Sequence, residues 1–341
     1  MSDRVRVALI GAGRIGRRHA ETLAHRLPRA ELVAIADASP ESARAAAEAV
    51  RVSRWTTDVE SLLADSTVQA VVIASPTETH SPFIAAAARA GKDVFCEKPI
   101  ALDLASTDSA LDAVEAAGVR LQIGFQRHFD RGYRRAKELI DAGALGRIEY
   151  IRDTMRDPRP QSREYTATSG GLFRDMAVHN FDSTRWLMGS EVEEVYALGV
   201  SLVDPMFAEL GDVDTSVVTL RFASGAIASI DNSRRASFGY DVRTEVHGSA
   251  GAVFVGYARE TPLLHLSAEG VRSDHVHWFL ERFEQAYVAE LGAFVEGIAA
   301  GRPPEVTGYD GRAAMAIAFA ADVSRRENRP VSLRAFDRKQ A

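Results

Sequence analysis

Segment 170–182 contains a histidine and two aspartates at helical spacing, and side chains of these types can carry out acid-base chemistry. Asp175, His179 and Asp182 stand at i, i+4 and i+7, so a helix would stack them on one face. Largely apolar neighbours indicate that this helix is half buried. A histidine held beside carboxylates in a cleft can accept a proton near neutral pH. The alternatives are a solvated polar stripe or a core histidine satisfied by its neighbours, and an isolated His-Asp pair is more often one of these.

A glycine-rich turn follows the first apolar run of the chain. Val5–Ile10 leads directly into residues 11–16, which read Gly-Ala-Gly-Arg-Ile-Gly and match G-x-G-x-x-G between a predicted strand and a predicted helix. Gly11 permits the tight turn, Gly13 lets the backbone approach a pyrophosphate, and Gly16 allows close helix packing. The amino terminus of the helix faces the negative charge of the phosphates. The segment is therefore predicted to bind a dinucleotide.

An acid stands where the second predicted strand, Leu32–Ala36, ends. Asp37 can accept hydrogen bonds from the adenosine ribose hydroxyls and repels a 2′-phosphate. The nearest arginine downstream is Arg44, because alanine, serine and proline follow the acid directly. The sequence therefore favours NAD over NADP. The alternative for Asp37 is a helix N-terminal residue.

Two more predicted strands end in polar residues. Ala70–Ala74 is followed by the segment 75–80, Ser-Pro-Thr-Glu-Thr-His, and Val94–Cys96 is followed by Glu97-Lys98-Pro99. Open α/β sheets bind ligands at the carboxyl ends of their strands. An ammonium at such an end could hydrogen-bond a substrate oxygen and stabilise an alkoxide, which makes Lys98 a catalytic candidate. A surface lysine is the commoner alternative for any single lysine.

Alternating apolar runs and alanine-rich amphipathic stretches organise the first third of the chain, as in a parallel sheet covered by helices. Strands are predicted at Val5–Ile10, Leu32–Ala36, Ala70–Ala74, Val94–Cys96 and Leu121–Gly124, and helices at 14–27, 40–50, 58–65, 79–90 and 103–117. Later helices are predicted at 131–142, 172–188, 278–300 and 310–327, with strands near 147–155, 192–203, 214–222, 226–235 and 242–256. The fold class is α/β, with a doubly wound parallel sheet in residues 1–124 and a mostly antiparallel sheet in residues 125–341.

Composition and charge limit the classes of function. The 341 residues are 46% hydrophobic and 26% charged, enough for two domains with their own cores. A formal net charge of -6 argues against nucleic acid or an anionic membrane as a partner. The single cysteine, Cys96, excludes an internal disulfide, and the first apolar run is too short for a signal peptide or a membrane span. We therefore expect a cytoplasmic protein that acts on a small molecule.

These segments together carry a family resemblance. Residues 11–16, Glu97-Lys98-Pro99 and Asp175-x-x-x-His179-x-x-Asp182 resemble the signature of the Gfo/Idh/MocA oxidoreductases, and more closely that of the inositol 2-dehydrogenases among them. The resemblance also covers 124–130, 156–158, 169–171, 211–215, 231–235 and 240–248. It implies an N-terminal Rossmann domain, a C-terminal α+β domain with a large open sheet, and a homo-oligomer, commonly a tetramer.

The resemblance further implies the oxidation of a polyol or sugar by NAD, which binds first. His179 would take the hydroxyl proton, while Asp175 and Lys98 would orient and polarise the reacting oxygen. The implied substrate-binding residues are Arg127, Asp157, Asp182 and Tyr240, each with a structural role as its alternative. The implied cofactor-binding residues are Gly11, Gly13, Arg14, Ile15, Gly16, Asp37, Ser75, Pro76, His80, Glu97, Lys98 and Gln126. For His80 the alternative is a helix-capping or buried histidine. No metal ion is expected, because hydride transfer works without one.

Departures from the inositol pattern lie near the presumed substrate side. They are Asn180, Met155 and the segment 159–162, and they leave open which polyol is used. A sugar or anhydrosugar dehydrogenase or reductase of the same family is one alternative. A non-catalytic NAD-binding regulator is another, but the presence of the lysine, the histidine and both carboxylates argues against it.

Overall fold

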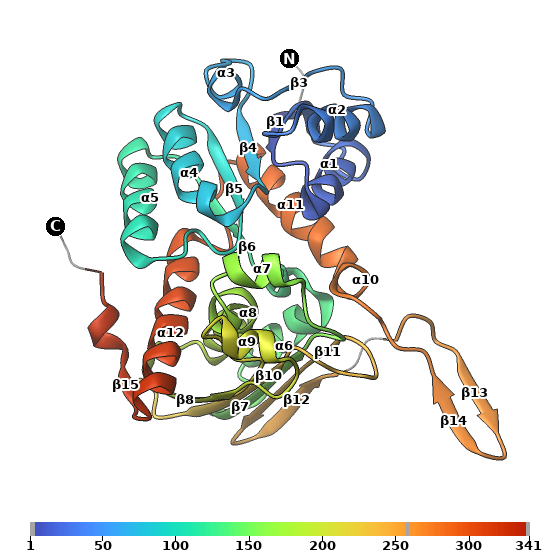
Figure 1. The fold of residues 1–341 in the computed structure, drawn as a ribbon, viewed down its shortest axis with the longest axis vertical. Helices are drawn as coiled ribbons and strands as arrows, with labels where there is room; N and C mark the ends of the chain where they lie inside the picture. The colour runs from blue at the N-terminus through green and yellow to red at the C-terminus, as the bar shows by residue number, and fades with distance from the viewer. Residues whose placement is uncertain (1–3, 257–258, 339–341) are drawn as a thin grey trace. The chain divides into compact units, whose positions relative to one another are not determined.

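The computed structural model describes residues 4–256 and 259–338, and the chain divides into two compact units (Figure 1). The first unit comprises residues 1–129 and 285–313, and the second comprises residues 130–284 and 314–341. Each unit is built on its own sheet. Among the described residues, no helix is both long enough and apolar enough to cross a membrane.

The first unit contains a six-stranded parallel sheet in the order β3-β2-β1-β4-β5-β6. Its strands are β1 (Val5–Ile10), β2 (Ala30–Ala36), β3 (Trp55–Thr56), β4 (Ala70–Ile73), β5 (Asp93–Glu97) and β6 (Leu121–Gly124). This is the order of a doubly wound sheet, in which the direction of winding reverses between β1 and β4. Ligands of such sheets bind at that point, outside the carboxyl ends of the strands.

Helices cover this sheet. They are α1 (Arg14–His25), α2 (Pro40–Ala49), α3 (Val59–Leu63), α4 (His80–Arg89), α5 (Leu104–Ala117) and α11 (Glu284–Ala299), and α12 (Gly308–Glu327) begins in this unit. Side chains at the N-caps of three helices, Ser39, Asp58 and Asp103, accept a backbone N–H of the first turn. Leu291 and Phe294 of α11 join the core of the sheet, which explains why a late helix belongs to the first unit.

The second unit contains a seven-stranded sheet in the order β12-β11-β7-β10-β9-β8-β15. Its strands are β7 (Ile148–Arg156), β8 (Val192–Val200), β9 (Thr215–Phe222), β10 (Ile227–Ser233), β11 (Asp241–Gly248), β12 (Gly251–Val255) and β15 (Val331–Ser332). Only β7 and β10 pair in parallel, so the prediction of a mostly antiparallel sheet is confirmed. One face is covered by helices that include α6 (Arg131–Asp141) and α8 (Val178–Met188) (Figure 1).

Several elements differ from the sequence expectations. The helix predicted at 172–188 begins with a π-helical segment, Phe173–Ala177, before α8. The helix predicted at 278–300 is divided into α10 (Phe279–Arg282) and α11, because Phe283 leaves the helical conformation. The elements missed include α7 (Arg163–Thr168), α9 (Pro205–Glu209), the short strands β3 and β15, and a hairpin of β13 (Leu264–Ser267) and β14 (Gly270–Ser273). They are too short for a periodic pattern to identify them.

Candidate functional site

The glycine turn at the end of β1 has the shape that a dinucleotide requires. Gly11 has φ +101°, and a side chain there would meet the Ala74 carbonyl at 2.5 Å. A side chain at Gly16 would lie 2.0 Å from the Gly11 carbonyl oxygen. At Gly13, by contrast, a side chain would meet no described atom within 4 Å. Packing therefore demands the outer two glycines, and the middle one presents open backbone at the start of α1, where a pyrophosphate fits.

Asp37, at the end of β2, is tied to the glycine turn. Its carboxylate accepts a hydrogen bond from the Ala12 N–H at 2.6 Å and another from the Ser39 N–H at 2.8 Å. The N-cap of α2 is Ser39, so Asp37 is not the capping residue. An ionised carboxylate in this place retains lone pairs for ribose hydroxyls. The residues on this edge of the sheet therefore fit NAD.

His80 links two turns that leave the same sheet. Its Nδ1 lies 2.7 Å from the Pro99 carbonyl oxygen, and its Nε2 lies 2.8 Å from the Ser75 carbonyl oxygen. Burial lowers the pKa of His80, and the two carbonyl contacts oppose this shift. The ring is 2% exposed and spans the segments after β4 and β5. The Lys98-Pro99 bond between them is cis.

Glu97, directly before Lys98, is hydrogen-bonded to a second histidine, His19. Oε1 of Glu97 lies 2.7 Å from Nε2 of His19, which is fully buried on α1. Lys98 itself is partly exposed. Two histidine rings therefore contact the residues on both sides of the lysine, Glu97 and Pro99.

Gln126 and Arg127 lie in the 3₁₀ turn that follows β6. Both are buried, at 3% and 1% exposure. Nε2 of Gln126 lies 3.4 Å from the hydroxyl of Tyr287 on α11. The predicted cofactor residue Gln126 and the predicted substrate residue Arg127 are thus both buried in the turn after the last strand of the first sheet.

The acid-base trio belongs to the second unit and is buried. Asp175 lies in the π-helical segment, with His179 and Asp182 on α8, and their exposures are 9%, 8% and 1%. A solvated polar stripe is therefore excluded. The π-helical segment also means that Asp175 is not related to the other two by regular α-helical spacing.

A buried guanidinium joins two of the predicted residues. Arg234 donates to Asp175 at 2.9 Å and to Asp157 at 3.2 Å. Burial alone would lower the pKa of Arg234, but the two carboxylates together raise it. The Tyr165 hydroxyl donates to the other Asp175 oxygen at 2.8 Å, and burial and that carboxylate raise the pKa of Tyr165. Arg234 and Tyr165 thus fix the position of the Asp175 carboxylate.

The sequence did not single out Arg234 or Tyr165 as site residues. The one sequence feature that could have identified Arg234 was its place in segment 231–235, which carries the family resemblance. No such feature marked Tyr165. Tyr240, a predicted substrate residue, is 8% exposed and packs edge-on against Phe283 with ring centroids 6.4 Å apart. Asn180, one of the departures from the inositol pattern, is hydrogen-bonded: its side-chain oxygen accepts a hydrogen bond from the Asn232 side chain at 3.0 Å.

A doubly wound sheet with this glycine turn and this acid defines a dinucleotide-binding protein. Comparisons with known proteins make the class more specific. Residues 5–125 match the model of an oxidoreductase family with an NAD-binding Rossmann fold, and residues 133–254 match the GFO/IDH/MocA C-terminal domain. The chain belongs to the Gfo/Idh/MocA family and is an NAD-binding oxidoreductase.

Relatives match over nearly the whole chain. A myo-inositol 2-dehydrogenase of Thermotoga maritima is 44% identical over 96% of this chain and 98% of its own. An inositol 2-dehydrogenase of Rhizobium meliloti is 41% identical over 96% and 99%. The solved structure of a scyllo-inositol dehydrogenase from Lactobacillus casei, with bound NAD(H) and scyllo-inositol, superposes with a TM-score of 0.92 at 30% identity, covering 97% and 99%. The predicted resemblance to the inositol 2-dehydrogenases is confirmed.

Proposed function

We propose that this protein oxidises a cyclic polyol with NAD, converting myo-inositol to 2-keto-myo-inositol, with His179 as the general base. The observation that carries the proposal is the full-length similarity to proteins named inositol 2-dehydrogenases. The presence of Lys98, Asp175 and His179 together in this chain supports a catalytic role rather than a regulatory one. Asp37 supports a preference for NAD over NADP, because its carboxylate repels a 2′-phosphate.

The chain's own residues divide the proton chemistry between them. When bound, NAD supplies a nicotinamide ring that accepts a hydride. His179 takes the proton of the substrate hydroxyl, and the Lys98 ammonium donates a hydrogen bond to the same oxygen as negative charge develops. Asp175, whose carboxylate is held by Arg234 and Tyr165, helps to orient the reacting oxygen.

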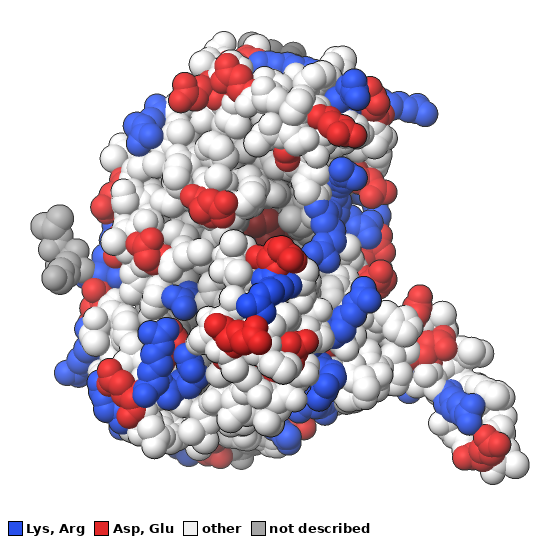
Figure 2. Space-filling view, in the orientation of Figure 1, with Lys and Arg blue, Asp and Glu red and all other residues white. Residues whose placement is uncertain are grey.

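Neighbouring hydroxyls of a ring need paired donors and acceptors. We assign their recognition to Arg127, Asp157, Asp182 and Tyr240. All four are buried, so a substrate hydroxyl that met them would do so away from bulk water. On the face shown in Figure 2, acidic and basic side chains are interspersed rather than gathered by sign, as suits a small-molecule partner better than nucleic acid.

The proposal predicts NADH formation from inositols. The wild-type protein should reduce NAD faster than NADP in a screen of myo-, scyllo- and chiro-inositol, glucose, galactose and an anhydrosugar. Lys98→Met should lower the rate by about 10²-fold, as removal of an oxyanion donor does, whereas Lys137→Met on α6 should not. A protein that binds NAD tightly but turns over no member of the panel would instead be a regulator.

We also propose a homo-oligomer, a tetramer, assembled through the uncovered face of the second sheet. Leu198, Val217, Ile227 and Phe254 are 49% to 57% exposed on its strands, and exposed apolar residues of this number indicate an interface. Light scattering should give about four chain masses for the wild type. Val217→Glu should lower the mass and Trp55→Glu, exposed on the first unit, should not. A wild-type mass of one chain would refute the assembly.

A further inference from the structure

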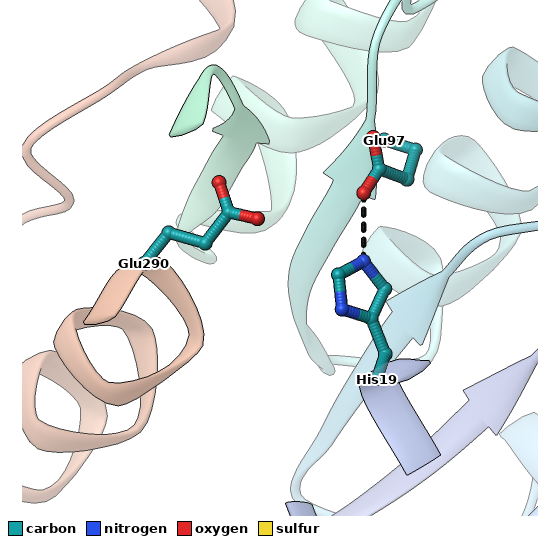
Figure 3. A group of neighbouring side chains, drawn as sticks. All are labelled: His19, Glu97 and Glu290. Atoms are coloured by element: carbon teal, nitrogen blue, oxygen red, sulfur yellow. Dashed lines mark hydrogen bonds and ion pairs between the residues drawn. The ribbon is translucent and has the colours of Figure 1, made fainter. Parts of the chain in front are cut away.

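Three ionisable side chains meet inside the first unit: His19 of α1, Glu97 of β5 and Glu290 of α11 (Figure 3). One nitrogen or oxygen of each lies within 4.8 Å of the others. His19 and Glu290 are fully buried, and Glu97 is 9% exposed. The imidazole and the Glu97 carboxylate are hydrogen-bonded at 2.7 Å. Glu290 therefore stands as a second carboxyl group beside an existing pair.

The Glu290 carboxyl group points toward this pair (Figure 3) but takes no hydrogen bond from any described residue. The titratable groups around it are His19, Glu97 and, one turn earlier on α11, Tyr287, whose ring packs against His19 at 6.2 Å. Gln122 of β6 donates to the backbone carbonyl of Glu290, not to its carboxyl group. Burial, and then the charge of Glu97, raise the pKa of Glu290 well above its ordinary value. A neutral acid suits these surroundings.

The geometry favours a proton here over a metal ion. Two ligands of one tetrahedral zinc ion, each about 2.0 Å from it, lie about 3.3 Å apart. The 2.7 Å separation of His19 and Glu97 is shorter and is that of a hydrogen bond. A shared ion would have to break this bond.

The cluster adjoins the lysine that the proposed function requires. Glu97 precedes Lys98, and the carbonyl of Pro99, which follows it, lies 2.7 Å from Nδ1 of His80. We propose that His19 and Glu290 are positioning residues for Lys98: His19 holds Glu97 by a hydrogen bond, and the buried Glu290 side chain fills the space beside Glu97. This proposal rests on the proposed function for the catalytic role of Lys98. The positioning of residues 97–99 by His19 and Glu290 does not depend on that function.

The neutral state of Glu290 can be tested by melting temperature against pH. A raised native pKa means that the folded state binds the proton more tightly, so wild-type stability falls as pH rises above the ordinary glutamate value. Glu290→Gln removes this loss, so its melting temperature should gain on the wild type as the pH rises above the ordinary glutamate value. Glu296→Gln is the matched control, since that exposed carboxylate of α11 pairs with Arg29. Equal pH dependence in wild type and Glu290→Gln would overturn the proposal, as would a stoichiometric metal ion that Glu290→Gln loses.

The positioning role can be tested on Lys98 directly. The chain has four lysines, so acetylation by acetic anhydride can be followed at each by mass spectrometry. His19→Leu should change the rate of Lys98 acetylation several-fold. It should also lower kcat about tenfold, with a smaller effect on the KM for NAD. His19→Gln, which keeps a donor near the Nε2 position, should restore both. Lys92, bonded to two backbone carbonyls, and Lys137 are internal references.

The outcomes separate this proposal from the proposed function. Unchanged Lys98 labelling in His19→Leu would overturn the positioning role whether or not the enzyme oxidises polyols. A wild-type protein that turns over no polyol would refute the proposed function, while the labelling and the pH dependence of melting would still decide the roles of His19 and Glu290. Changed labelling together with a flattened pH dependence in Glu290→Gln would support both.

Discussion

Replacing His179 with alanine should lower kcat/KM for polyol oxidation by about 10²–10⁴-fold, the usual contribution of a positioned general base. The side chain is 8% exposed on α8. Bulk water therefore cannot readily replace it as the proton acceptor. Steady-state NADH formation at saturating NAD measures the effect.

The pH profile tells a lost base from a disturbed fold. A histidine base works only when neutral, so wild-type kcat/KM should fall as the pH drops through the pKa of the base, and the residual activity of His179→Ala should lack this limb. NADH binding should be retained in the variant, because the glycine turn and Asp37 belong to the first unit. His25→Ala, at an exposed position in the last turn of α1, is the control. Near-wild-type turnover of His179→Ala would refute the assignment of the base.

Asp182 has a role that the same assay can define. It lies three residues after His179 on α8 and is 1% exposed. If it tunes the histidine, Asp182→Asn should shift the acid limb of the profile, because a nearby carboxylate stabilises the imidazolium. If it binds substrate, the variant should raise KM and leave the limb in place.

The first sheet could be predicted because its strands are buried on both faces and read as short apolar runs. The glycine turn could be predicted for a related reason, since Gly11 and Gly16 each face backbone atoms within 2.5 Å of where a side chain would begin. The second sheet was recognisable from alternation, as in β9, where every other residue is buried. Local patterns therefore gave most of the architecture.

The partners of the site residues could not be predicted in this way. Arg234 is 59 residues from Asp175 in the chain, and His19 is 78 residues from Glu97. No local periodicity reports such pairs, because they depend on how β10 meets the π-helical segment and how α1 packs beside β5. The π-helical segment itself also escaped prediction, since its residues suit an α-helix equally well.

Replacing Arg234 with methionine should destabilise the protein by about 3–5 kcal/mol, because it leaves two buried carboxylates without their cation. Asp157 and Asp175 are 6% and 9% exposed, and both bind the guanidinium. The measurement is the urea midpoint of unfolding. Arg235→Met, at the exposed neighbouring position, is the matched control and should stay within about 0.5 kcal/mol of the wild type.

A second substitution shows whether the cost of Arg234→Met is electrostatic. Adding Asp157→Asn removes one of the uncompensated charges, so the double variant should recover part of the lost stability, whereas two unrelated sites would add their losses. Activity should not recover with it if Asp175 acts as proposed, because its carboxylate has still lost the donor that fixes its position. If Arg234→Met is as stable as Arg235→Met, the buried ion pairs do not hold this site together, and the orientation of Asp175 must come from other contacts, such as the one with Tyr165.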